Sequence, residues 1–273
     1  MSTSIVWDKN MPRYKIIGNK IQLMDTRFDH YSDEALSFFS KLESLAGSPP
    51  PIALTDTQEL TEWRNRQWKE FSEAIENCRH KIQAINYSIS LIESEIKNPP
   101  IPRFKLLMDL EEKEFFDDIV LFEFESFLFQ ILSFMDVFVH LLKLFYPVLN
   151  SKDKYRIGFK GRGVEGRGVA GKGTSDALRG AGEVELADYI DDEVEKWIQV
   201  IYDLRNEIVH HSRVRNLQMF LIGKNGLNAP KFSDNGMDLL EYCKNTYENL
   251  KIFLNNIDND FLFSKADSFY EIK

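Results

Sequence analysis

The sequence predicts an all-α protein: an antiparallel bundle of four to five long helices with a small N-terminal β-hairpin. Three observations support this prediction. Apolar residues recur at helical spacing over most of the chain after residue 55, and Gly or Pro residues separate the periodic segments. The composition, 43% hydrophobic and 28% charged over 273 residues, is globular and supplies a sizeable core.

The N-terminal 30 residues form the predicted β appendage, and residues 31–273 form the predicted helical domain. Residues 14–24 read as two short strands around Gly18-Asn19, which suits a hairpin turn. A first short helix is expected over residues 31–46, because Gly47 and three prolines follow it.

A second helix is expected from a capping box at Thr55 and Gln58 to the stop at Asn98-Pro99. Its apolar residues alternate in steps of four and three, which indicates helices that pack side by side. This seam consists of Phe71, Ile75, Cys78, Ile82, Ile85, Ile89, Ile92 and Ile96.

The third helix, expected over residues 106–149, is predicted to be the central one. Nine of the 21 Phe residues lie between Phe115 and Phe145. Charged residues interrupt the apolar run, so the segment predicts a buried helix and no membrane span. The two cysteines, Cys78 and Cys243, lie too far apart for a metal-binding motif, so neither a metal nor another cofactor is predicted. The chain is expected to be cytoplasmic.

Residues 150–183 predict a flexible cationic loop, because they contain nine of the 14 glycines and eight basic residues. No apolar strand precedes the glycines, as a nucleotide-binding phosphate loop would require. The loop is either a plain solvated linker or a basic arm that contacts RNA phosphates. The candidate RNA-binding residues in it are Lys160, Arg162, Arg167 and Lys172. The net charge of −9 excludes a uniformly basic nucleic-acid-binding surface.

A fourth helix is expected over residues 186–218 and a fifth over residues 236–263. Helical spacing places four apolar residues of the fourth helix on its core side. These are Trp197, Ile201, Leu204 and Ile208. A polar stripe of Asp203, Asn206, His210 and Arg213 lies on the other side, with Arg205 on its flank.

The segment Arg205-Asn206-x-x-x-His210 resembles the Arg-x4–6-His motif of the HEPN superfamily. The resemblance is close over about ten residues and extends as architecture over residues 55–263. It implies a metal-independent endoribonuclease that cleaves RNA by attack of the 2′-OH at the cleft of a homodimer. Proteins of this family act in prokaryotic defence and as toxins, so an antitoxin or defence partner is also expected.

The resemblance assigns catalysis to Arg205, Asn206 and His210. An imidazole such as that of His210 acts as a general acid or base near neutral pH. A guanidinium such as that of Arg205 holds a phosphate and offsets the charge of the transition state. The side chain of Asn206 donates to the phosphate or orients His210.

Several alternatives stay open in the sequence. His211 also satisfies the motif spacing, and Asp203 and Glu207 are supporting candidates. Arg213 and Arg215 are further candidates for RNA binding. Position 212 is Ser, whereas related toxins that are silenced on a tyrosine carry Tyr there. A non-catalytic HEPN module that binds RNA or a partner protein is the alternative to an enzyme.

Overall fold

The computed structural model describes residues 14–17, 20–23, 38, 39, 42, 58–98, 113–115, 118–149, 159, 173–211, 214–223 and 226–262. The predicted mostly helical class is confirmed within these residues. The strands β1 (Tyr14–Ile17) and β2 (Lys20–Leu23) pair antiparallel, with Ile17 opposite Lys20. Their connecting turn lies outside the described residues, so the N-terminal hairpin stays a prediction.

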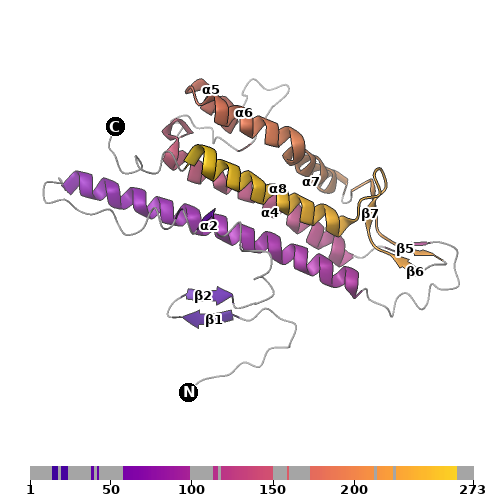
Figure 1. Ribbon diagram of the computed structural model, residues 1–273. Coiled ribbons are helices and arrows are strands. Elements are labelled where there is room, and N and C mark those ends of the chain that lie inside the picture. Colours follow the sequence, from indigo (N-terminus) through magenta and orange to yellow (C-terminus); the bar gives the residue numbers. More distant parts are fainter. Residues whose placement is uncertain are drawn as a thin grey trace, which may run out of the picture.

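Helix α2 (Gln58–Lys97) packs along helix α4 (Asp118–Phe145), and the two helices run antiparallel. Contacts along their length show the direction, because residue numbers rise on one helix as they fall on the other. These contacts are the Phe71 and Phe145 rings at 5.9 Å, Lys81 Nζ and Gln130 Oε1 at 3.1 Å, and the Ser88 and Ser126 hydroxyls at 3.2 Å. Figure 1 shows α4 beside α2 along most of its length.

Helix α8 (Leu239–Ile257) lies against both α2 and α4 and continues into a π-helical turn, η4 (Asp258–Leu262). It runs antiparallel to α2, because Asn86 Nδ2 donates to Tyr247 Oη at 3.0 Å and Lys244 Nζ lies 3.1 Å from Glu93 Oε1. Helix α8 is therefore parallel to α4.

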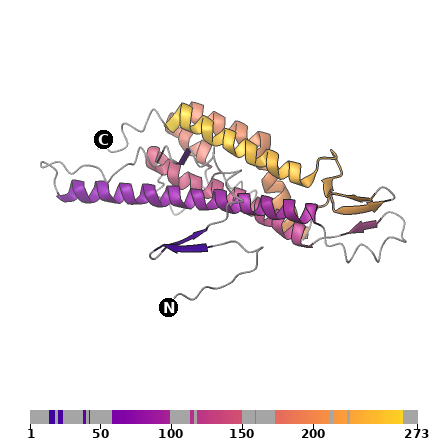
Figure 2. The same cartoon turned by 60° about the horizontal axis from the view of Figure 1, so that its bottom comes forward.

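The remaining long helical segment comprises α6 (Val184–Glu193), a π-helical turn η3 (Val194–Ile198) and α7 (Gln199–His211). It begins beside the C-terminal end of α8, where Asn256 Nδ2 donates to Tyr189 Oη at 3.2 Å. After α7 the chain meets the segment that precedes α8, where Asn216 Nδ2 donates to Asp234 Oδ2 at 3.0 Å. Helix α7 thus runs antiparallel to α8 and α4, and its C-terminal end lies near the N-terminal end of α4 (Figures 1 and 2).

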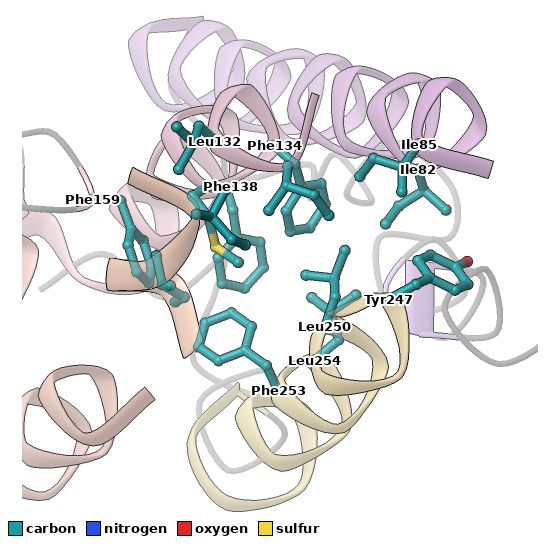
Figure 3. Close-up of a cluster of buried hydrophobic side chains, with 14 of the residues drawn as sticks. Ile82, Ile85, Leu132, Phe134, Phe138, Phe159, Tyr247, Leu250, Phe253 and Leu254 are labelled. Atoms are coloured by element: carbon teal, nitrogen blue, oxygen red, sulfur yellow. The ribbon is translucent and has the colours of Figure 1, made fainter. Parts of the chain in front are cut away.

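The core lies between α2, α4 and α8. The first seven residues of the predicted α2 seam are at most 2% exposed, which confirms the periodicity argument. Figure 3 shows Phe134 and Phe138 of α4 and Phe253 and Leu254 of α8 gathered in this core. The Phe138 ring lies 5.7 Å from the Phe253 ring in an edge-on contact, a geometry that aromatic pairs favour.

Helix α4 is long and apolar enough to cross a membrane, but 56% of its most apolar window is buried inside the protein. Its interior position accounts for its composition and is compatible with a soluble protein.

The predicted third helix begins too early. Residues 113–115 form a strand, β3 (Lys113–Phe115), which pairs antiparallel with β5 (Phe220–Gly223). In turn, β5 pairs with β6 (Gly226–Asn228), so the sheet order is β3-β5-β6. A pairing across more than a hundred residues is invisible to local periodicity, which explains the error.

The predicted fourth helix ends too late. Helix α7 stops at His211, and β4 (Leu217–Gln218) pairs antiparallel with β7 (Lys231–Phe232). The run Phe220-Leu-Ile, followed by Gly223 and Gly226, carried a local signal for strands and a tight turn, and it lies between the two predicted helices in a segment that was left unassigned.

The predicted cationic loop is too long at its C-terminal end. Residues 174–180 form helix α5 (Thr174–Gly180), which follows the short 3-10 helix η2 (Pro147–Leu149) in the structure. Arg179, which had been assigned to the loop, is in α5 and pairs with Asp188 at 2.7 Å and Asp191 at 2.8 Å. Phe159 is buried and lies 5.9 Å from the Phe253 ring.

Candidate functional site on helix α7

The core side of α7 is the one that helical spacing predicts. Trp197, Ile201, Leu204 and Ile208 are all buried. The π-helical turn η3 precedes α7, and its Trp197 indole donates to Oε2 of Glu193, the last residue of α6, at 2.7 Å. This bond satisfies a buried carboxylate and fixes the rotation of the helix just before the motif.

The polar stripe on the other side is open to solvent at Asp203, Asn206 and His210. Arg213, the fourth residue of the expected stripe, lies outside the described residues. No pair among Asp203, Asn206 and His210 forms a hydrogen bond in the part of the chain that the structure describes. The helix therefore places these three groups on one side without locking them to one another.

Arg205 occupies a different position from the stripe, on the side of α7 that meets α4. Its guanidinium carbon lies 4.9 Å from the centroid of the Phe129 ring of α4, within the range of a cation–π contact. Its Nη1 also donates to Asn206 Oδ1 at 3.3 Å. The half-buried guanidinium is thus held from two directions at the boundary between the helices.

The two adjacent histidines differ in their hydrogen bonds. Arg215 Nη2 lies 2.8 Å from His211 Nε2. A guanidinium has only donors, so His211 Nε2 accepts and the proton of the neutral ring is on Nδ1. The His210 ring is exposed and lies 6.5 Å from the His211 ring, and no hydrogen bond engages it among the described residues. His210 is therefore the histidine with both ring nitrogens accessible to a ligand.

The supporting carboxylates are both engaged by neighbouring groups. Glu207 Oε2 accepts a hydrogen bond of 3.1 Å from the backbone N–H of Arg215. Asp203 Oδ1 accepts one of 2.7 Å from Gln199 Nε2. The side chain of the same Arg215 lies against His211. Their geometry suits a structural role around the motif.

The remaining sequence candidates for RNA binding, Lys160, Arg162, Arg167 and Lys172, lie outside the described residues. No group of three or more metal-ligating side chains gathers in the described part of the chain. The site thus offers an accessible imidazole, a fixed guanidinium and an amide, which are the groups needed for acid–base chemistry at a phosphate.

Two phenylalanines near the motif were missed by the sequence analysis, which assigned the Phe-rich helix to the core. Phe129 supports Arg205, and Phe122, seven residues before it, is 67% exposed. The spacing of seven places both rings on one side of α4. The adjacent charged residues Glu123 and Glu125 were the available signal that this side reaches solvent.

No family model matches the chain, and neither a curated protein nor a solved structure shows significant similarity to it.

Proposed function

We propose that this protein is a HEPN-like, metal-independent endoribonuclease of the cytoplasm, and that its helices form the antiparallel bundle with the N-terminal hairpin expected for the chain. The single observation that carries the proposal is the state of His210, which is exposed and free of hydrogen bonds among the described residues, one turn after Asn206. A solvated imidazole suits proton transfer at an RNA phosphate.

His210 acts as the general acid or base in this proposal, and Arg205 holds the phosphate. The 2′-OH of the RNA gives its proton to a general base and its oxygen attacks the adjacent phosphorus. The P–O5′ bond breaks, and the leaving O5′ takes a proton from a general acid; His210 fills one of these two roles. The products are a 2′,3′-cyclic phosphate and a 5′-OH. His211 is the weaker candidate, because its Nε2 is occupied by Arg215.

A homodimer completes the proposed site. His210 follows Arg205 by five positions, which turns the two side chains about 140° apart around the helix axis. Arg205 and His210 of one copy therefore point in different directions. A second copy that faces the first across a cleft brings its own motif to the same site and supplies the missing group. Val209 between them is 50% exposed, an apolar contact suited to that interface. Proteins with this chemistry serve in defence or as toxins, and a partner protein that restrains the site is part of the proposal.

The same angular separation favours a second candidate, a non-catalytic HEPN module that binds RNA or a partner protein. Such a module needs no imidazole and guanidinium on one reacting phosphate. It predicts salt-sensitive RNA binding without cleavage. Replacing Lys160, Arg162, Arg167 and Lys172 with Ser tests the basic arm and leaves intact the buried Thr174, which begins α5.

The decisive experiment compares wild type with His210→Ala in cleavage of bulk tRNA and other structured RNA with EDTA present. We expect wild type to leave 2′,3′-cyclic ends and His210→Ala to be slower by roughly 100- to 10,000-fold, the usual contribution of a general acid or base. His211→Ala is the matched control and should keep most of the activity.

Circular dichroism should show unchanged helicity in both variants, because both side chains are exposed. Full activity in His210→Ala, or a larger loss in His211→Ala, would contradict the assignment of His210. Binding without cleavage by wild type would support the non-catalytic module.

A further inference from the structure

A cavity of about 350 Å³ lies where helix α6 begins, at the end of the helical segment opposite the motif. Three segments of the chain line it: Tyr146, residues 182–186, and Asp260 with Phe261 of η4. His210 follows Val184 by 26 positions, so the cavity lies about 40 Å from the motif along the helix axis. Its volume is near the lower end of the range typical of small-molecule sites. We call it the α6–η4 cavity.

The walls of this cavity are held by hydrogen bonds and ring contacts within the protein. Tyr146 Oη donates to the backbone oxygen of Phe261 at 3.1 Å. Burial and the nearby Glu183 raise the pKa of the Tyr146 hydroxyl, which therefore keeps its proton for this bond. The Phe261 ring stacks on the Tyr189 ring at 5.7 Å, and the Glu183 N–H donates to the Leu178 oxygen at 3.0 Å. The cavity is therefore formed without a ligand.

Negative charge dominates the lining. Glu183, Glu185 and Asp260 contribute three carboxylates, and no Lys or Arg occurs among the described residues that line the cavity. Acidic residues at the start of a helix stabilise it, which accounts for Glu183 and Glu185. It does not account for Asp260, which comes from the segment after α8 and brings a third charge to the same space. Three like charges around one cavity favour the binding of a cation.

The arrangement of these carboxylates indicates the kind of cation. They line one cavity, but no group of three metal-ligating side chains gathers around a single point in the described part of the chain. The charge is thus spread along the cavity and suits a ligand whose own charges are separated. Val184 is 46% exposed and Phe261 is half-buried, so both offer apolar surface between the carboxylates.

We propose that the α6–η4 cavity binds a linear polyamine, a small aliphatic chain with two or more ammonium groups. The ammonium groups pair with the carboxylates of Glu183, Glu185 and Asp260. The methylene groups lie on Val184 and on the Phe261 ring, whose face also attracts a neighbouring ammonium group. This site is separate from the motif on α7 and goes beyond the proposed ribonuclease function.

An anion is the competing occupant, because the free N–H groups at the start of a helix attract anions. The side chain of Glu183, the residue before α6, makes no capping hydrogen bond to these groups. However, an anion in the cavity would lie beside three carboxylates and no basic side chain of the described lining. Repulsion by these carboxylates argues against an anion. Inorganic phosphate is therefore a useful negative probe.

Isothermal titration calorimetry of the full chain with spermidine, at low salt and without RNA, tests the proposal. We expect saturable binding at one site per chain. Butylamine should bind roughly tenfold more weakly, because it has one ammonium group and loses two exposed ion pairs. Neither Mg²⁺ nor inorganic phosphate, each at the concentration of spermidine, should displace it.

Charge variants locate the site. Asp260→Asn should weaken spermidine binding about threefold, and Glu183→Gln/Glu185→Gln/Asp260→Asn should weaken it about 30-fold, at the usual strength of one and three exposed ion pairs. The matched control removes the same number of charges from exposed positions outside the cavity: Asp192→Asn/Glu195→Gln/Glu241→Gln. The control should bind nearly as wild type does, because the overall charge of the chain is not what holds the ligand.

A cavity-filling variant tests the shape without changing the charge. Val184→Trp should lose most of the spermidine binding, because the larger side chain occupies the space between the carboxylates. Val200→Trp is its control, since Val200 is 45% exposed on α7 and does not line the cavity. Circular dichroism checks the fold of each variant. If the triple charge variant is unfolded, Asp260→Asn carries the test, because it leaves α6 unchanged.

Four results would overturn the polyamine site. They are the absence of saturable spermidine binding, equal weakening by the two triple variants, unchanged binding by Val184→Trp, and displacement of spermidine by Mg²⁺ or phosphate. None of them bears on the ribonuclease proposal, because the titration contains no RNA and all the variants keep Arg205, Asn206 and His210.

Discussion

Phe residues have different surroundings in two regions of helix α4. In its C-terminal half, Phe138 is fully buried, and the rings of Phe134 and Phe253 each lie 5.7 Å from its ring. Near the N-terminus of α4, where the C-terminal end of α7 lies close by, Phe122 is mostly exposed. The difference teaches that a Phe-rich helix is not uniformly a core helix.

The sharpest test of this contrast is a pair of identical substitutions on one helix. Phe138→Ala should lower the free energy of unfolding by about 3–5 kcal/mol, because it leaves a cavity among packed rings. Phe122→Ala should change it by no more than about 0.5 kcal/mol, because the ring is already in solvent. Urea denaturation followed by circular dichroism measures both. Similar losses in the two variants would mean that Phe122 is packed in solution.

Local spacing predicted the α2 seam because a helix that buries one side must repeat its apolar residues in steps of three and four. Ile82, Ile85 and Ile89 follow this rule, and all three are fully buried. The strand at residues 113–115 could not be found in this way, because its partner lies near residue 221. Strand pairing is non-local, and only the partner decides whether a short apolar segment is a strand.

At the candidate site, too, local spacing predicted which residues are buried but not which residues of different segments meet. Periodicity separated the buried Leu204 and Ile208 from the exposed His210, since all three lie on one helix. It did not place Arg205 over Phe129, because that contact depends on how α7 crosses α4. Nor did it distinguish His210 from His211, which required the position of the Arg215 side chain after the helix ends.

A second, smaller test concerns the polar groups inside the core. Asn86 is buried between α2 and α8, and its Nδ2 donates to Tyr247 Oη while its Oδ1 has no partner in the described structure. Tyr247→Phe leaves both ends of this amide unpaired and should lower the free energy of unfolding by about 1–3 kcal/mol.

The control for Tyr247→Phe is the double variant Asn86→Leu/Tyr247→Phe, which also removes the unpaired amide of Asn86. It should be more stable than Tyr247→Phe alone, because an apolar pair needs no hydrogen bonds. Urea denaturation of the three proteins gives the comparison. A double variant less stable than the single one would show that Asn86 has a further partner, and that this interaction outweighs the cost of burying the amide.

The smallest expected effect on stability concerns two carboxylates, those of Glu93 and Glu123, whose pKa values are shifted in opposite directions. Hydrogen bonds from Lys97 and Lys244 hold the pKa of Glu93 below its ordinary value, whereas burial raises the pKa of Glu123. A lowered pKa means that the ionised Glu93 stabilises the fold above the ordinary carboxyl range, and that this contribution is lost as the pH falls through the folded-state pKa. A raised pKa means that ionised Glu123 costs stability at neutral pH, and that protonation removes the cost.

The variants Glu93→Gln and Glu123→Gln should therefore deviate from wild type in opposite directions at pH 7. Glu93→Gln should be less stable by up to about 1 kcal/mol, since the side chains of its partners Lys97 and Lys244 are 66% and 37% exposed, and Glu123→Gln should be slightly more stable. Both differences should vanish as the pH falls below the range in which carboxyl groups titrate, because wild type then carries neutral groups at both positions. Urea denaturation from pH 3 to pH 8 tests the sign of each. A destabilised Glu123→Gln at pH 7 would show that the hydrogen bond between Glu123 and Ser88 outweighs the cost of burying the carboxylate, so that ionised Glu123 stabilises the fold.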